Sequence, residues 1–211
     1  FIFSGSQNFH LMQNITQSLA GRVPIFRLFP FDIQELKKAG LLQEEYTFLL
    51  LKGFYPAIYD RNIPPVDFYS NYIETYIQRD VSELVAIQDM SLFRKFLALC
   101  ATRAGQVLNM TSLAKECGIS APTVKAWLSA LENSYIVYLL QPYYKNFSKR
   151  IIKSPKLYFY DTGLLCHLLK INDATKIVNQ CVKGALFENM VISEYVKRIY
   201  HTSEKQVEPW F

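Results

Sequence analysis

The sequence predicts a mainly α-helical fold with short strands, and three observations predict it. A helix-turn-helix pattern followed by two hydrophobic strands occupies Met110–Tyr160. Apolar residues recur at helical spacing over much of the rest of the chain. Short hydrophobic runs near the two ends indicate further strands, so we expect parts of α/β structure to flank a helical centre.

Residues 1–42 are predicted as strand, helix, strand and helix, the order of an α/β sheet. Phe1–Ser6 fits a buried strand, Gly21 stops the helix that follows, and Val23–Phe29 fits a second strand. Asp32 can cap the next helix. Because the chain starts on a strand and without Met, we expect it to be a fragment of a longer protein.

Residues 43–89 are predicted to be helical. After Pro64-Pro65, apolar residues recur at spacings of three and four from Phe68 to Leu84, which predicts one long amphipathic helix. A further helix at Ser91–Arg103 would open a winged helix-turn-helix that spans residues 90–160.

Within that unit, the turn chemistry fits two crossing helices. Gly118 can turn between them, Ser120 can cap the second helix, and Pro122 suits its first turn. A strand, a basic loop and another strand follow, which is the order of a winged helix. The apolar positions expected to join the two helices are Leu113, Cys117, Ile119, Val124 and Trp127.

The whole net charge of +5 lies in the segment 133–160, which contains these two strands and their loop, because it has five basic residues and no acidic one. Basic groups neutralise DNA phosphates and release counterions. The alternative is a solvated hairpin loop over a core of tyrosines. The residues expected to contact DNA are Thr123 and Lys125 on the second helix and Lys145, Lys149, Arg150 and Lys153 in the loop.

The second helix offers few side chains that could read bases, since Ala126 and Ala130 are small and Glu132 repels phosphates. We therefore expect non-specific DNA binding that depends on the loop. The rival hypothesis is a module that contacts a regulatory protein partner or a second copy of the chain.

Other function classes find little support. Cys100, Cys117, Cys166 and Cys181 are too far apart in sequence for a zinc knuckle or a redox motif, so buried free thiols are expected. No apolar run is long enough for a membrane span, and we expect a cytoplasmic protein without a membrane partner. No metal site is predicted, because His10, His167 and His201 are widely separated.

Six segments resemble, in the same order, those of bacterial and archaeal AAA-type ATP-binding proteins that carry a C-terminal domain of unknown function. This resemblance covers nearly the whole chain. It implies the end of an ATPase core at 1–42, a helical lid at 43–89, a winged helix at 90–160 and the start of a restriction-endonuclease-like, nuclease-like domain at 161–211. The segments are Phe1–Ser6, Ser18–Arg22, Pro30–Leu36, Tyr76–Val81, Lys153–Leu165 and Gly184–Asn189.

The resemblance also implies roles for four residues. Ser4 or Ser6 would sense the γ-phosphate of ATP, and Arg22 would contact phosphate, with Mg²⁺ present in the complete protein. Glu188 would be the first carboxylate of a Mg²⁺-dependent nuclease site. The Walker A loop and the acidic magnesium strand are absent from this sequence, so this chain alone is expected to bind no cofactor and to be inactive as an ATPase.

Each of these roles has a plainer structural alternative. The stretch from Ser4 to Ser6 can be a turn, and Arg22 can stabilise the end of the preceding helix. Glu188 can stabilise the start of its own helix, and Asp161 is better explained as a helix cap than as a ligand.

Overall fold

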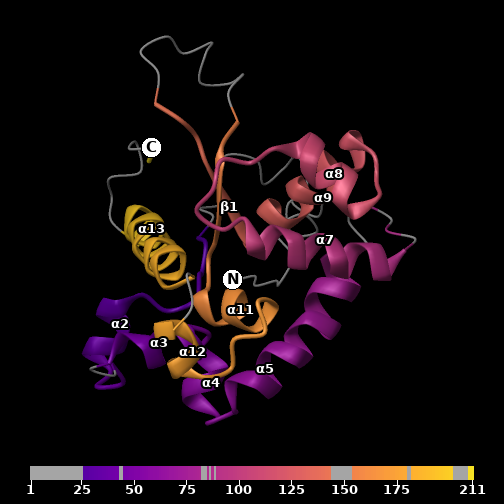
Figure 1. The fold of residues 1–211 in the computed structure, drawn as a ribbon. Helices are drawn as coiled ribbons and strands as arrows, with labels where there is room; N and C mark the ends of the chain where they lie inside the picture. The colour runs from indigo at the N-terminus through magenta and orange to yellow at the C-terminus, as the bar shows by residue number, and fades with distance from the viewer. Residues whose placement is uncertain are drawn as a thin grey trace, which may run out of the picture.

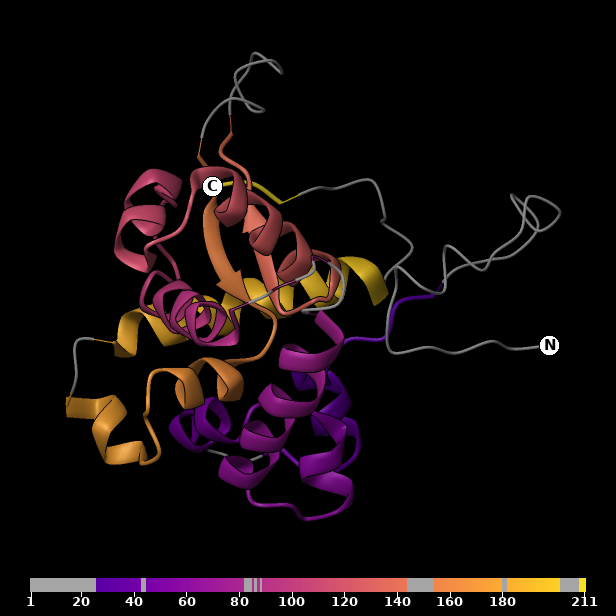
Figure 2. The same cartoon turned by 90° about the vertical axis from the view of Figure 1, so that its right-hand side faces the viewer.

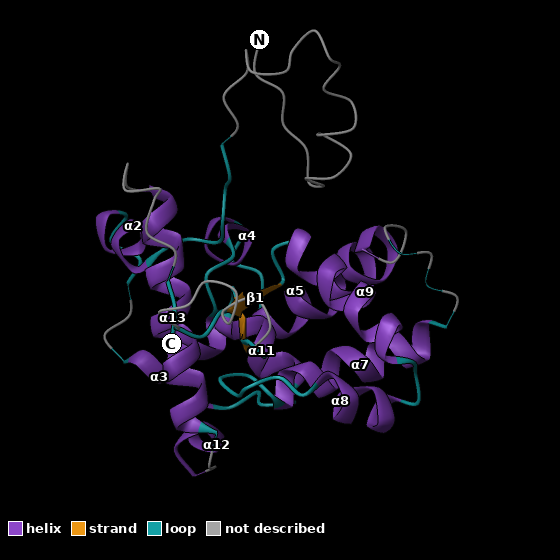
Figure 3. Ribbon diagram, turned by 90° about the horizontal axis from the view of Figure 1, so that it is seen from above, coloured by secondary structure: helices purple, strands orange, loops and turns teal. Residues whose placement is uncertain are grey.

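A computed structural model describes residues 26–42, 45–81, 85, 87, 89–143, 154–179, 182–201 and 209–211. In these ranges most residues are helical, and the strands β1 (Val137–Leu140) and β2 (Lys156–Phe159) form a small antiparallel sheet at the centre (Figure 3). The prediction of a mainly α-helical chain with short strands is therefore confirmed. No helix in the described ranges is long and apolar enough to cross a membrane.

One group of helices lies below the sheet in the view of Figure 1. Here α11 and α12, which follow the sheet in sequence, pack against α3, which precedes it. The helices of this lower group are α2 (Ile33–Lys38), α3 (Tyr46–Lys52), α4 (Pro56–Asp60), α5 (Pro65–Tyr72), the π-helix η2 (Ile73–Val81), α11 (Thr162–Leu168) and α12 (Ala174–Asn179).

The second group, residues 90–159, is called the helix–hairpin unit. Its helix α9 packs against β1, α8 packs on α7 and α9, and α13 (Lys183–His201) runs beside the sheet and contacts β2, α11 and α3 (Figure 2). The elements of the unit are α7 (Met90–Thr102), α8 (Met110–Cys117), α9 (Ala121–Asn133), β1 (Val137–Leu140) and β2 (Lys156–Phe159).

The sheet is extended beyond its two strands by short stretches of pairing. Val137 lies opposite Phe159 in the β1–β2 register. On the other side of β2, the Gly105 N–H donates to the Leu157 carbonyl at 2.8 Å, and the Leu108 N–H donates to the Pro155 carbonyl at 2.8 Å. Beyond β1, Phe211 pairs with the backbone that follows the strand, so segments from distant parts of the sequence meet here.

Several helix ends agree with the sequence. The side chains of Asp32, Ser120 and Asp161 each accept a hydrogen bond from a backbone N–H three residues ahead, as predicted for caps. Gly118 adopts a left-handed conformation with φ of 84° after α8. These signals are local in sequence, which is why the pattern alone could identify them.

One prediction of local structure was wrong, and another was incomplete. The described part of the predicted strand Val23–Phe29 forms no strand, and Phe26 and Leu28 are exposed. A β-branched and aromatic run makes a strand only where a partner strand is available. The predicted long helix is continuous but changes from α-helix to π-helix at Ile73. There the Thr75 hydroxyl donates to the Asn71 carbonyl at 2.6 Å, the acceptor that the Thr75 N–H would use in an α-helix.

Candidate functional site

The helices of the helix–hairpin unit are joined by an apolar core. Trp127 of α9 lies between Phe93 and Phe96 of α7, with ring centroids 5.2 Å away in both cases and the rings packed edge to face. Leu113 and Val124 are fully buried between α8 and α9. The predicted packing of α8 on α9 is therefore confirmed, whereas the ring contacts of Trp127 join α9 to α7.

The two residues of α9 that were predicted to contact DNA differ in exposure and in hydrogen bonding. Lys125 is exposed. Thr123 is half-buried, and its hydroxyl lies 2.7 Å from the Ser120 hydroxyl within the cap of the helix. The exposed face of α9 around Lys125 consists mainly of small side chains, including Ala126 and Ser129. This face can approach a phosphate backbone closely, but it offers few groups that discriminate between bases.

The four loop cations, Lys145, Lys149, Arg150 and Lys153, lie outside the described residues. The structure describes the two strands to which their segment is attached, with Leu140 of β1 opposite Lys156 of β2 at the end of the hairpin where this segment begins and ends. Lys156 adds a further cation there, although its ammonium lies 3.2 Å from a carboxylate oxygen of Glu188.

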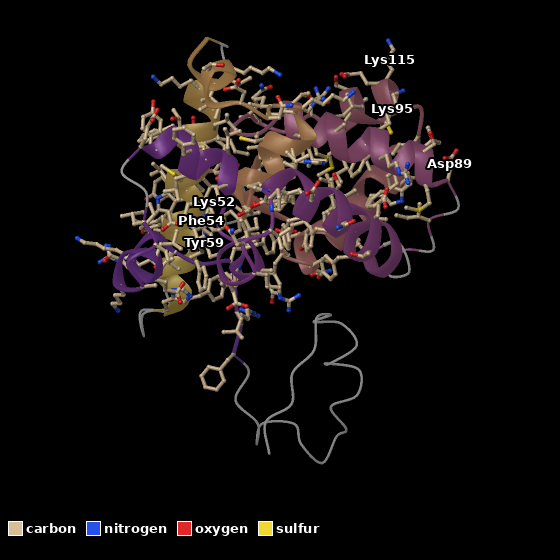
Figure 4. The ribbon with its side chains drawn as sticks, turned by 90° about the horizontal axis from the view of Figure 1, so that it is seen from below. Lys52, Phe54, Tyr59, Asp89, Lys95 and Lys115 are labelled. Atoms are coloured by element: carbon tan, nitrogen blue, oxygen red, sulfur yellow. The ribbon has the colours of Figure 1, made fainter. Side chains whose placement is uncertain are left out.

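Other charges of the unit surround α7 and α8. Lys95 and Lys115 lie on one edge of the molecule together with Asp89, and Lys115 points outward (Figure 4). Arg103 pairs with Glu116 at 2.5 Å. Hydrogen bonds from Arg103 and then Ser112 lower the pKa of Glu116, so this carboxylate is ionised and offsets the charge of Arg103 near neutral pH.

Glu188, predicted as a nuclease carboxylate, is bonded to two residues of β2. The Tyr158 hydroxyl donates to Glu188 Oε1 at 2.6 Å, and Lys156 donates to the same oxygen. The hydrogen bond from Tyr158, followed by that from Lys156, lowers the Glu188 pKa despite partial burial. Among the described residues Glu188 belongs to no cluster of potential metal ligands. It is also the sixth residue of α13, beyond the first turn where it was expected to stabilise the helix terminus.

Asp161 makes a buried polar centre where β2 ends. Its carboxylate accepts hydrogen bonds from the Phe54 N–H, the Leu164 N–H and the Tyr69 hydroxyl, each at 2.7 Å. Burial raises the pKa of Asp161, and the bonds from Tyr69, Leu164 and Phe54 oppose that rise. Asp161 is thus a cap, as predicted, but it also joins α11 to α5 and to the loop after α3.

Space around this carboxylate is filled. A Cβ added to Gly53 would lie 1.9 Å from the Tyr69 hydroxyl oxygen and 2.8 Å from both carboxylate oxygens. One added to Gly163 would lie 2.3 Å from the same hydroxyl. Glycine is required at both positions because the Tyr69 side chain, which is only 1% exposed, already occupies the space. The arrangement therefore serves packing and leaves no room for a substrate at Asp161.

A second buried charge, Lys197, ties α13 to the lower helices. Its ammonium donates to the Phe31 carbonyl at 2.8 Å and to Glu194 at 3.0 Å, and it lies 4.2 Å from the centre of the Phe54 ring. Phe54 therefore contacts two charged side chains: its backbone N–H donates to Asp161, and its ring faces Lys197. We call Asp161, Tyr69, Phe54, Lys197 and Glu194 the buried polar network.

Asp32, Glu35 and His201 are brought close enough for their ligand atoms to share an ion. Asp32 and Glu35, however, form a reciprocal capping box at the start of α2, and His201 Nδ1 lies 2.9 Å from Asp32 Oδ2. Burial alone would raise the Asp32 pKa, but hydrogen bonds from Glu35 and His201 lower it. These contacts explain the cluster as a joint between α2 and α13.

Sequence reasoning missed most of these buried polar residues. The Asn189 side chain makes two hydrogen bonds to the backbone of Phe159 in β2. The Phe159 N–H donates to Asn189 Oδ1 at 2.8 Å, and Asn189 Nδ2 donates to the Phe159 carbonyl at 2.9 Å. Nothing in the helical spacing of Asn189 or Lys197 indicates a partner 30 or 166 residues away. Cys100, Cys117 and Cys166 are buried free thiols, as expected, and Cys181 lies outside the described residues.

Comparison with known proteins identifies a family without an assigned activity. The model of a family described as "Domain of unknown function (DUF8612)" matches residues 43–175. Two proteins described as uncharacterized, from Mycobacterium bovis and Mycobacterium tuberculosis, are each 28% identical over 196 residues, covering 92% of this chain and 43% of their own length. An uncharacterized protein from Haemophilus influenzae is 19% identical over 216 residues, covering 94% of this chain and 51% of its own. No solved structure matches.

These matches correct the expectation of an AAA-type ATPase. The matched family is a domain of unknown function, and the names of the relatives contain no ATPase. Ser4, Ser6 and Arg22 lie outside the described residues, so their roles, with ATP and Mg²⁺ as cofactors, rest on that overturned resemblance alone. The chain spans less than half the length of the mycobacterial relatives. Because the family model covers more than half of the sequence, the chain belongs to the DUF8612 family.

Proposed function

We propose that this chain binds duplex DNA without sequence specificity, through a winged helix formed by residues 90–159. The order of elements supports the proposal: α7, segment 104–108 with its two isolated bridges to β2, α8, α9, β1 and β2. The observation that carries it is the hydrogen bonding of segment 104–108 to β2, because this pairing completes the small sheet of a winged helix. Without that pairing, α8 and α9 would be only a helix pair.

The basic connection between β1 and β2 is the proposed DNA-contacting wing. Lys145, Lys149, Arg150 and Lys153 would neutralise phosphates, with Lys125 of α9 as a further contact. The small side chains on the exposed face of α9 support backbone contact in place of base recognition. The carboxylate of Glu188 is engaged by Tyr158 and Lys156, which argues against the nuclease alternative.

The test measures the affinity for a random-sequence duplex over a range of salt concentrations. Replacing the four wing cations by Ala should reduce the slope of log affinity against log salt by up to about 3–4, since each phosphate contact contributes about 0.9. The matched control removes four exposed cations from other surfaces: Lys37, Lys38, Arg61 and Lys183.

The control variant should keep the salt slope of the unmodified protein. Equal slopes for the wing variant and the control would contradict the proposal. That outcome would favour the rival hypothesis, in which the same unit contacts a protein partner or a second copy of the chain.

A further inference from the structure

A groove of about 1290 Å³ lies between the lower helices, away from the proposed wing. Its walls are α3, α5 with η2, and α11 with the segment after it, and Arg94 and Leu97 of α7 also line it, so it joins parts of the chain more than 100 residues apart. Except for Lys176, every lining residue falls within residues 43–175, the range of the family model. The groove is thus a feature of the family's own domain.

Apolar side chains form most of the groove surface. Leu51, Ile58 and Ile171 line it. Phe48 of α3 and Val66 of α5 also line the groove and are each 51% exposed. Covering such half-exposed side chains with an apolar partner is favourable by about 25 cal/mol per Å² of apolar surface removed from water.

The charges around this apolar surface are mostly positive. Among the lining residues, two are acidic, Glu74 and Asp173. His167 also lines the groove, and burial lowers its pKa, so it adds no charge near neutral pH. An occupant with carboxylates beside its apolar side chains would complement this surface. The cationic lining residues are Lys52, Arg94, Lys170 and Lys176.

The backbone of the walls restricts the conformation of the occupant. None of the lining residues belongs to a described strand, so an extended peptide would find no sheet edge with which to pair. A helix satisfies its own backbone hydrogen bonds and can place apolar side chains at every third or fourth position against the groove. The groove volume also exceeds the range of about 300–1,000 Å³ typical of small-molecule pockets.

We therefore propose that this groove binds an acidic amphipathic helix of a partner protein. The apolar face of that helix would cover Phe48 and Val66, and its flanking carboxylates would lie near Lys170 and Lys176. This site is separate from the proposed DNA-binding wing: its described lining residues include two from α7 of the helix–hairpin unit but none from α9, β1 or β2.

The experiment uses two fluorescent helical peptides with the same apolar face, one flanked by Glu and one by Lys. We expect the Glu-flanked peptide to bind in fluorescence anisotropy and the Lys-flanked peptide to bind at least about tenfold more weakly. Phe48→Asp should weaken binding about tenfold or more, because it places a like charge at the apolar contact.

Two matched controls lie on α13, outside the groove. Phe187 is 47% exposed, close to the exposure of Phe48, and Phe187→Asp should leave peptide binding unchanged. Lys176→Glu should weaken binding, whereas Lys183→Glu should not. No binding of the Glu-flanked peptide, or equal binding of the two peptides, would overturn the proposal. Competition by a short oligonucleotide would also overturn it, by assigning the cations of the groove to nucleic acid.

Discussion

Trp127 in the helix–hairpin unit and Asp161 at the end of β2 are both buried, but their surroundings differ in kind. Trp127 is enclosed by the rings of Phe93 and Phe96. Asp161 is enclosed by hydrogen-bond donors from its own helix α11 and from two distant parts of the chain, α5 and the loop after α3. Apolar packing tolerates small adjustments, whereas a buried carboxylate requires each donor in place. Apolar packing therefore holds the helix–hairpin unit together, whereas directional polar contacts add to the apolar core at its junction with the lower helices.

The largest effect is expected for Trp127→Ala. Removing the indole leaves a cavity between α7 and α9, which should lower the free energy of unfolding by about 3–5 kcal/mol. Urea unfolding followed by far-UV circular dichroism measures this change. Trp127→Phe, which keeps an aromatic ring, should lose much less. A small loss in the Ala variant would show that packing around Trp127 is not what holds the unit together.

Asp161→Asn tests the polar side of the comparison. In either orientation of the Asn side chain, its NH2 group faces at least one N–H group that now donates a hydrogen bond to the carboxylate. We therefore expect the free energy of unfolding at neutral pH to fall by about 2–3 kcal/mol. Glu188→Gln is the control, because this exposed carboxylate should contribute less than about 1 kcal/mol after solvent screening. Equal losses for the two variants would contradict a special role for the buried polar network.

Gly163→Ala tests the packing around the buried polar network, because it adds volume beside Tyr69 and removes no charge. The new Cβ would lie 2.3 Å from the Tyr69 hydroxyl, and overpacking of this kind lowers the free energy of unfolding by about 1–3 kcal/mol. At Gly184, in α13, a Cβ would meet nothing within 4 Å. Gly184→Ala should therefore be neutral or stabilise the protein by up to about 1 kcal/mol. Thermal unfolding of both variants distinguishes crowding from a general effect of glycine replacement.

The smallest effect concerns Asp32, which joins α2 to α13 through His201. Its pKa is lowered in the folded protein, so its charge stabilises the fold above the ordinary value of 3.8, and this contribution is lost as the pH falls through the lower folded value. Asp32→Asn should cost about 1 kcal/mol or less at neutral pH, since Asn also caps helices. The difference from the unmodified protein should shrink below pH 3.8. A difference that persists in acid would contradict this assignment.

Local features of this fold could be predicted from the sequence, and long-range polar contacts could not. Ser120 and Gly118 act on residues within one turn, so their roles can be inferred from a short window. The partner of Asp161 at Phe54 is 107 residues away, and no periodicity links them. The same reason explains the groove: its walls become neighbours only when α11 packs on α3 and α5.

The proposed DNA-contacting segment could be selected from the sequence for a different reason. Charge composition can be counted without knowing the fold, and the basic wing segment was identified in that way. The sequence could not indicate that Lys156, the first residue of β2 after the wing segment, pairs with Glu188 of α13. Its charge is therefore partly offset, which leaves the wing cations as the main proposed DNA contacts.

The amide of Asn189 has a consequence for association between molecules. By bonding to both the N–H and the carbonyl of Phe159, it occupies the hydrogen-bonding positions that a foreign strand would need beside β2. Segment 104–108 covers the neighbouring positions, and Trp210-Phe211 lies along the backbone that continues β1. A sheet this small, covered in this way, is a poor template for edge-to-edge aggregation. Asn189→Leu should uncover β2 and raise the tendency of the protein to self-associate.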